Sequence, residues 1–416
     1  MKIESIDGRV ETESSRVSAR IRWEDSAREP LDLYFEARGE AARDVRPDGN
    51  SLLLACAIPA MRHGERRIAI EGTVCPYLRD GILAAASLLE AWYGPRTVPQ
   101  IEPSAGFGPP RPAPVRRAAA FLSGGMDSLD VFVRNGSSFP AGHPARFAEA
   151  IHVSGLPYTG PPGSPSRESF VARARRAATA LARVLDVPLS FVRTNLGEID
   201  RDFLFFRHEY FGSAYAAVAH LFSRRFTSVS FASAQHLGVR LDPLGSHPLL
   251  DPLYSSGALE FRHEGADRGR LAKGKALAPR PDLVAHLQVC LTTPFGDARP
   301  NCGRCEKCLH TQIELRLAGV SGPFPEGALS VPSLRAMRAD PHTAFFWTPL
   351  PDRLRQSGDG DLADAIEEKI REMDRIRDWS RDRGWKGLLR RLDRRYLGSA
   401  LLDLRRALRP ARERPA

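Results

Sequence analysis

The chain has 416 residues, 42% hydrophobic and 26% charged, which is typical of soluble proteins and enough for two or three domains. No apolar run approaches the roughly 20 residues of a membrane span, and residues 1–20 lack the apolar middle of a signal peptide, so we expect a cytoplasmic protein. Residues 381–416 carry twelve Lys or Arg against four Asp or Glu, and they account for most of the net charge of +10. The rest of the chain is nearly neutral, so we do not expect it to form a nucleic-acid surface.

The first part of the chain predicts a small α+β domain over residues 1–94. Apolar and polar residues alternate in short runs up to about residue 70, which favours antiparallel strands. Residues 73–92 instead have apolar residues at helical spacing. Seven prolines then fall in residues 95–114, so we interpret residues 95–115 as a semi-rigid linker.

Residues 116–320 predict a second, α/β domain. Short apolar strands are expected at 116–122, 148–155, 188–195 and 227–234, with helices at 167–185 and 210–225. Strands that alternate with helices indicate a doubly wound parallel sheet covered on both faces. Ligands of such sheets bind beyond the carboxyl ends of the strands.

A Ser-Gly-Gly turn follows the first strand of this domain and precedes a helix. Backbone N–H groups at a helix start, two glycines without side-chain bulk and the hydroxyls of Ser123 and Ser128 together predict an anion cradle. Asp127 would repel phosphate unless it holds a bridging Mg²⁺. The predicted nucleotide-binding residues are Ser123, Gly124, Gly125, Met126, Asp127 and Ser128.

These residues resemble the SGGxDS signature of the PP-loop ATP pyrophosphatases. The resemblance implies a HUP-like α/β fold that binds ATP with Mg²⁺ and cleaves it between the α and β phosphates. Such proteins commonly place a Lys or Arg after a late strand, where Arg268, Arg270, Lys273 and Lys275 stand here. We expect Asp127 and Lys273 to be catalytic, whereas a solvated helix face is the alternative for the four basic residues.

Long loops rich in proline occupy residues 235–256 and suit substrate recognition. Four histidines lie in or near them, and no pair has the spacing of a metal site on a helix. We therefore expect each to be a polar loop residue. They are His208, His236, His247 and His263.

Four cysteines lie close together between residues 290 and 308. Cys290 is followed by Cys302, Cys305 and Cys308, and two residues separate each of these last three from the next. This pattern places four thiolates within reach of one tetrahedral Zn²⁺. A site closed by four sulfurs leaves no position for water, so the predicted metal is structural. An iron–sulfur cluster needs the same ligands and is the alternative.

With this cysteine pattern, the region from Arg116 to Gly319 resembles the 7-cyano-7-deazaguanine synthases. The resemblance implies zinc binding by the four cysteines, adenylation of a carboxylate with release of pyrophosphate, and displacement of AMP by ammonia. The Tyr-Gly-Gln and Asp-Cys-Arg elements of that family are absent here, so we expect a different acceptor.

Residues 321–416 predict a helical, basic extension. A charged helix is expected at 362–379, and leucines lie among arginines over 387–408. The second segment either packs its leucines on the body or binds nucleic acid or a membrane.

The sequence therefore predicts an AMP-forming, ATP-dependent ligase that joins ammonia or an amine to a carboxylate or amide acceptor. Transfer of sulfur or nitrogen to tRNA, and a non-catalytic adaptor that uses the basic tail, are the alternatives. A homodimer is compatible with the sequence.

Overall fold

The computed structural model describes residues 1–11, 14–110, 113–156, 165–238, 241–290, 299–338, 340 and 343–380. The chain divides into two compact units. One contains Met1–Gly303 and Thr311–Pro325, and the other contains Arg304–His310 and the described residues from Glu326 onward. Every helix among the described residues is too short or too polar to span a bilayer.

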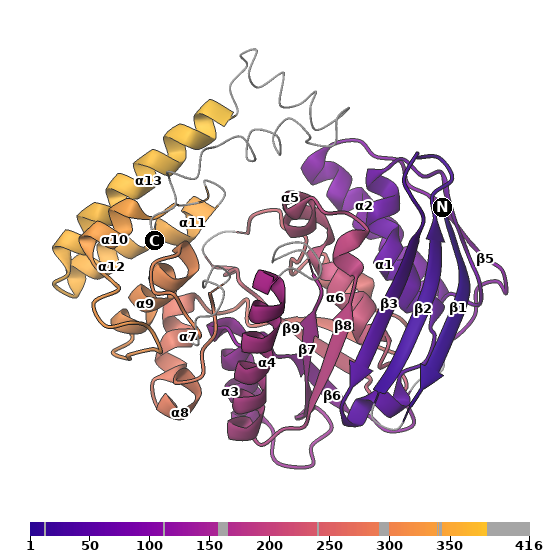
Figure 1. Ribbon diagram of the computed structural model, residues 1–416, viewed down its shortest axis with the longest axis horizontal. Coiled ribbons are helices and arrows are strands. Elements are labelled where there is room, and N and C mark those ends of the chain that lie inside the picture. The colour runs from indigo at the N-terminus through magenta and orange to yellow at the C-terminus, as the bar shows by residue number, and fades with distance from the viewer. Residues whose placement is uncertain are drawn as a thin grey trace. The chain divides into compact units, whose positions relative to one another are not determined.

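The first unit is built on one sheet, whose ten described strands have the order β10-β9-β6-β7-β8-β3-β2-β1-β4-β5 (Figure 1). Strands β6 to β10 are mutually parallel, β8, β3, β2 and β1 pair antiparallel in turn, and β4 and β5 run parallel to β1. The strands are β1 (Lys2–Val10), β2 (Ser14–Arg22), β3 (Leu31–Arg38), β4 (Arg67–Ile70), β5 (Gln100–Pro103), β6 (Ala118–Phe121), β7 (Phe147–Ser154), β8 (Leu189–Thr194), β9 (Ser228–Ala232) and β10 (Glu260–Glu264).

Strands β6 to β10 have the order of a doubly wound α/β fold. The chain moves from β6 outward to β7 and β8, and then returns to the other side of β6 with β9 and β10. Helices α3 (Met126–Ser138) and α4 (Pro165–Leu185) pack in the core on one face, and α6 (Phe211–His220) packs in the core on the other. The predicted α/β class is confirmed. The order of the strands reverses between β6 and β9, which is where ligands of such sheets bind.

Strand β6 is apolar throughout because both of its faces are covered. Ala118 and Ala120 belong to the core under α3, and Ala119 and Phe121 belong to the core under α6. Since successive side chains of a strand point to opposite faces, a strand buried on both sides shows no polar alternation. The short alanine side chains also let the helices on both faces approach the strand closely.

The N-terminal residues, which we expected to form a separate domain, extend the same sheet. Strand β3 pairs antiparallel with β8, with Phe35 opposite Thr194 and Arg38 opposite Phe191. The expected linker contributes the edge strand β5, and its Pro103 lies at the end of that strand, where proline is tolerated. The alternating pattern of β3 buries one face, and pairing also covers the otherwise open edge of β8.

Helix α1 (Gly49–Arg62) lies in a region where we expected only strands. All residues from Asn50 to Met61 are buried, so the helix shows no polar face in its sequence. It packs against α6, and Ser51 Oγ donates to the carbonyl oxygen of Ala217 at 2.7 Å. Periodicity cannot identify a helix that is apolar on all sides.

Helix α2 (Pro76–Tyr93) lies close to its expected bounds and buries the predicted stripe, including Leu78, Ile82 and Leu89. The remaining short helices of this unit connect the strands and loops. They are η1 (Glu40–Asp44), η2 (Leu196–Glu198), α5 (Phe203–Phe205), η3 (Phe206–Tyr210), η4 (Asp251–Tyr254), α7 (Arg270–Leu277) and α8 (Pro281–Val284).

The described residues beyond Glu326 are helical, as expected. Glu306, in the first turn of α9 (Glu306–Leu317), accepts hydrogen bonds from Asp340 N at 3.0 Å and Trp347 Nε1 at 3.1 Å. The leucine- and arginine-rich segment 387–408 lies outside the described residues. The other helices of this unit are α10 (Val331–Ala336), α11 (Ala344–Trp347), α12 (Leu350–Gln356) and α13 (Gly360–Ser380).

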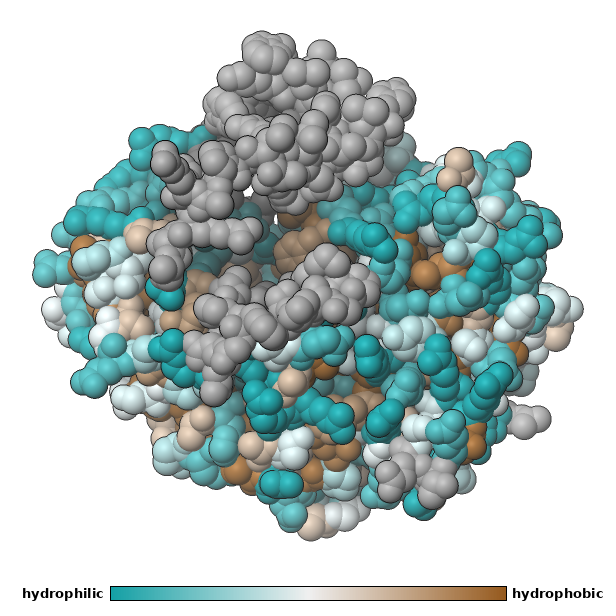
Figure 2. Space-filling model, viewed as in Figure 1, coloured by the Kyte–Doolittle hydropathy of each residue, from teal (hydrophilic) through white to brown (hydrophobic). Residues whose placement is uncertain are grey.

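Hydrophilic residues predominate over most of the coloured surface in Figure 2, and the apolar residues there occur in small groups. Large exposed apolar side chains such as Tyr77, Val115 and Leu249 come from separate segments of the chain. Scattered apolar residues of this kind are usual on protein surfaces. These scattered residues do not test the homodimer, which stays a prediction.

Candidate nucleotide and metal site

The Ser-Gly-Gly turn connects β6 to α3 at the reversal of strand order. Ser123 Oγ lies 3.1 Å from Ser128 Oγ and accepts the N–H of Gly125 at 3.3 Å. Ser128 Oγ is also 2.9 Å from the carbonyl oxygen of Gly125, to which it can donate. Helix α3 begins after Gly125, which supplies no side-chain cap. The turn thus places two hydroxyls beside the start of a 13-residue helix, where the helix dipole favours an anion.

The conformation of the turn depends on Gly124 and on a buried histidine. Gly124 has φ +85°, in the left-handed region that residues with a Cβ rarely adopt. His152 Nδ1 donates to the carbonyl oxygen of Leu122 at 2.8 Å, and burial lowers the pKa of this imidazole, so it stays neutral near pH 7. The Met126 side chain packs in the core, so only the backbone of this predicted binding residue can face a nucleotide.

Asp127 lies between two cations from α7. Lys273 Nζ is 3.0 Å from Asp127 Oδ1, and Arg270 Nη1 is 3.0 Å from Asp127 Oδ2. Lys273 is only 1% exposed and also donates to the carbonyl oxygen of Ser233, after β9, at 2.6 Å. The turn after β6, the end of β9 and α7 therefore meet at one group of charges. Lys275, the other basic residue of α7, is exposed.

A second ion pair holds the segment before α7 against α3. Arg268 Nη2 donates to both carboxylate oxygens of Asp130, at 2.7 and 2.8 Å, and the Asp130 side chain is fully buried. Burial raises the pKa of Asp130, and the Arg268 guanidinium opposes that rise. Asp130 lies one helical turn after Asp127, so this pair positions Arg270 and Lys273 opposite Asp127. The sequence analysis did not select Asp130, although its spacing of three residues from Asp127 was visible.

Replacing Arg268 by methionine should destabilise the protein by about 2 to 3 kcal/mol at pH 7, less than for a fully buried pair because Arg268 is 27% exposed. The raised pKa of Asp130 should rise further without the guanidinium. A carboxyl group that binds its proton more tightly in the folded state favours folding at low pH, so the loss should be smaller at pH 5 than at pH 7. Denaturant unfolding at both pH values measures this.

Arg134→Met is the matched control, because Arg134 pairs with Asp267 at the surface and both side chains are nearly half exposed. Its cost should stay below about 1 kcal/mol and be nearly independent of pH over this range. Equal losses for the two variants would contradict a structural role of the pair between Asp130 and Arg268.

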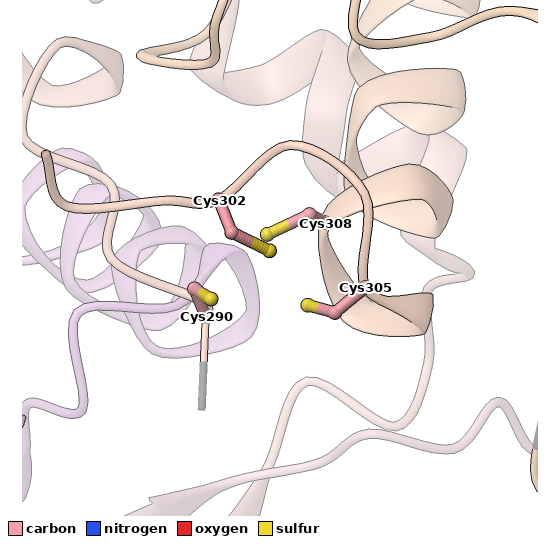
Figure 3. A group of neighbouring side chains, drawn as sticks. All are labelled: Cys290, Cys302, Cys305 and Cys308. Carbon is pink, nitrogen blue, oxygen red and sulfur yellow. The ribbon is translucent and has the colours of Figure 1, made fainter. Parts of the chain in front are cut away.

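The four predicted metal-binding cysteines come together. The Sγ atoms of Cys290, Cys302, Cys305 and Cys308 all lie within 4.8 Å of one another, and the side chains point toward a common centre (Figure 3). One tetrahedral ion at about 2.3 Å from each sulfur would set neighbouring sulfurs about 3.8 Å apart. Cys290 and Cys308 are buried, and the other two are partly exposed. The group therefore fits a metal ion held by four thiolates.

Asn301 fixes the backbone around the first two of these cysteines. Its Oδ1 accepts the N–H groups of Val289 at 2.9 Å and Cys290 at 3.2 Å, and its Nδ2 donates to the carbonyl oxygens of Leu287 at 2.8 Å and Pro323 at 3.2 Å. Asn301 is fully buried, and these four contacts use the hydrogen-bonding capacity of its amide. Asn301, the residue before Cys302, thus makes direct hydrogen bonds to Cys290 and to the residues just before it.

Gln288 links the cysteine segment to the Ser-Gly-Gly turn. Its backbone N–H donates to the carbonyl oxygen of Gly124 at 3.0 Å, and its side-chain Nε2 donates to the carbonyl oxygen of Cys290 at 2.8 Å. The residue is 5% exposed. The sequence analysis missed Gln288, and no local pattern marks it, because Gly124 lies far from it in the chain.

On the prediction that the Ser-Gly-Gly turn binds ATP·Mg²⁺, Gln288→Ala should weaken that binding by about 3- to 10-fold, because loss of one side-chain hydrogen bond of about 1 kcal/mol loosens the segment that supports Gly124. Calorimetric titration with ATP·Mg²⁺ measures the change. The exposed Gln356 at the end of α12 provides a control, and Gln356→Ala should bind like the unsubstituted protein. Unchanged affinity in Gln288→Ala would show that the turn does not depend on this contact.

No family model, no curated protein and no solved structure matches this chain.

Proposed function

We propose that the protein is an AMP-forming, ATP-dependent ligase that adenylates a carboxylate or amide oxygen for attack by ammonia or an amine. The observation that carries the proposal is the placement of Asp127, Lys273 and Arg270 beside the Ser-Gly-Gly turn, at the reversal of strand order. This arrangement supports the resemblance to PP-loop ATP pyrophosphatases. The acceptor is proposed to differ from a deazaguanine.

In this proposal the turn and the start of α3 bind the pyrophosphate portion of ATP. Phosphate oxygens would replace Asp127 as the partners of Lys273 and Arg270. The Asp127 carboxylate would then be free to hold Mg²⁺, which would supply positive charge against the phosphates. Lys273 is held between Asp127 and Ser233, so its ammonium group needs little reorganisation before it meets the developing charge. The proposal thus gives Asp127 and Lys273 the catalytic roles that the sequence analysis expects.

The four cysteines are proposed to bind one structural Zn²⁺. In a multi-iron cluster the thiolates bind different iron atoms and spread apart, whereas sulfurs within 4.8 Å of one another suit a single ion. Through Asn301 and Gln288 this ion would stabilise the segment that contacts Gly124. Its role is therefore support of the nucleotide site rather than contact with the substrate.

The cysteines disfavour sulfur transfer. Four of the six belong to the metal group, and Cys56 and Cys75 are buried. Burial raises the pKa of the Cys56 thiol to about 12, so it is almost entirely protonated at neutral pH. Since the thiolate is the reactive form, Cys56 is a poor sulfur carrier.

Incubation of the protein with α-labelled ATP, Mg²⁺, ammonium chloride and the small-molecule fraction of a cell extract tests the proposal. The expected products are labelled AMP and unlabelled pyrophosphate, and Asp127→Asn should abolish both. Release of labelled ADP, or AMP formation that is unaffected by Asp127→Asn, would reject it.

A further inference from the structure

Asp251 and His263 form a buried pair away from the nucleotide turn and the cysteines. His263 Nδ1 lies 2.7 Å from Asp251 Oδ2, and the two side chains are 3% and 0% exposed. Ser246 Oγ donates to the same carboxylate oxygen at 2.7 Å. Because a carboxylate accepts hydrogen bonds, the proton between the pair belongs on Nδ1, and in a neutral imidazole Nε2 then carries the lone pair.

His263 Nε2 has no hydrogen-bond partner among the described residues, although it is buried. Tyr254, in the same short helix as Asp251, also has a buried hydroxyl without a partner. Buried polar atoms almost always have a partner in the protein, in water or in a ligand. An open pocket of about 460 Å³ is lined by Ser255, Ser256 and His263, and since the His263 side chain is only 3% exposed, the pocket reaches this residue through its backbone. A buried acceptor without a donor therefore indicates a site for a small bound molecule.

The pairing of the strands places His263 near the carboxyl ends of the parallel strands, on the face of the sheet that α6 covers. His263 is opposite Phe231 of β9, and the preceding residue, Ser230, is opposite Ala120 of β6. His263 therefore lies two strands, or about 10 Å, from the end of β6, where the Ser-Gly-Gly turn begins. Both groups are near the carboxyl ends of parallel strands, where ligands of doubly wound sheets bind.

The surroundings hold Asp251 in place. A Cβ on Gly212, at the start of α6, would overlap Asp251 Oδ1 and the carbonyl oxygen of Gly245, so α6 packs directly against the carboxylate. The backbone N–H of His247 lies 3.4 Å from Asp251 Oδ1. A carboxylate fixed in this way orients the imidazole and stabilises its protonated form.

We propose that Asp251 and His263 bind the nitrogen nucleophile of the reaction, with Nε2 accepting a hydrogen bond from its N–H group. This inference rests on the proposed function. In the reaction, the nitrogen forms a bond to the acyl carbon while the bond from that carbon to the oxygen of AMP breaks. AMP leaves with the electron pair, and the proton lost by the nitrogen passes to His263 Nε2, where Asp251 stabilises the resulting imidazolium.

The test uses full-length, zinc-loaded, ATP-bound protein with ¹⁵N-labelled histidine. Ammonium chloride and methylamine hydrochloride are the probes, and tetramethylammonium chloride is the control with the same charge and no N–H group. NMR should show His263 Nε2 unprotonated in the absence of amine. Ammonium or methylamine should shift this resonance saturably, tetramethylammonium should not, and His152 should be unaffected. Tighter binding of ammonium would identify free ammonia as the source of nitrogen, and tighter binding of methylamine would identify a larger amine.

His263→Asn keeps an N–H donor at the position of Nδ1 for Asp251 but removes the Nε2 acceptor, so it should fold and bind the amine at least 10-fold more weakly by calorimetry. A protonated Nε2, an equal response to tetramethylammonium, or undiminished amine binding by His263→Asn would overturn the proposal. Failure of the protein to bind ATP would reject the proposed ligase. The tautomer and the amine response of His263 can also be measured without nucleotide, so the two failures can be told apart.

Discussion

Lys273→Met should weaken ATP·Mg²⁺ binding by about 10- to 100-fold, because a hydrogen bond to a charged group contributes about 1.5 to 3 kcal/mol. Methionine keeps most of the length and packing of the lysine side chain, so the change mainly removes the ammonium group that contacts Asp127 and Ser233. Formation of AMP should fall by a larger factor than ATP binding, since charge develops on the phosphate in the transition state. Calorimetry and a product assay with labelled ATP measure the two effects.

Lys275→Met is the matched control, as Lys275 lies on the same helix but is exposed. It should leave ATP binding and AMP formation within about 2-fold of the unsubstituted protein, as expected for a surface charge with little energetic role. Denaturant unfolding of both variants separates a loss of binding from a loss of folding. Similar affinities in the two variants would show that ATP does not use the cations around Asp127.

Cys308→Ser should remove most of the bound zinc. A structural zinc site contributes about 10 to 16 kcal/mol in zinc-finger peptides, so one ligand of four accounts for roughly 3 to 4 kcal/mol, or about 200- to 1,000-fold in zinc affinity. Cys308 is buried in α9, so the variant should also unfold at a lower temperature. Elemental analysis and thermal unfolding measure these two changes.

The loss of metal should also reach the nucleotide site. Cys290 is bound through Gln288 to Gly124, so a loosened cysteine segment should weaken ATP binding as well. Cys56→Ala provides the control, because Cys56 is buried in α1 and belongs to no metal group found among the described residues. It should keep one zinc per chain and normal ATP affinity. Full zinc content in Cys308→Ser would rule out the four-cysteine site, and normal ATP affinity after zinc removal would rule out the coupling.

The parts of the site that the sequence predicted depend on residues close together in the chain. The Ser-Gly-Gly turn needs only a buried strand before it and a helix after it. Glycine is needed at position 124 because the backbone there has a positive φ, which residues with a Cβ rarely adopt. Cys302, Cys305 and Cys308 lie within seven residues, so their spacing nearly determines the metal geometry.

Contacts between distant segments could not be predicted in the same way. Asp127 and Lys273 are 146 residues apart, and Asp130 and Arg268 are 138 residues apart. The sequence suggested four basic residues and put Lys273 first, but only the packing of α7 against α3 showed that Lys273 and Arg270 both contact Asp127. Gln288 showed no signal, because its role depends on a backbone oxygen of Gly124.

The sequence by itself indicated the alternation of strands and helices, the turn after β6 and the group of cysteines. The tertiary structure decided that β3 joins β8, so that the N-terminal residues share one sheet with the nucleotide region. It also decided that Asp251 in η4 and His263 in β10 become a buried pair. The physical reason is that local patterns follow from backbone geometry and side-chain periodicity over a few residues. Long-range pairs depend instead on which buried surfaces and strand edges fit one another after the chain has folded.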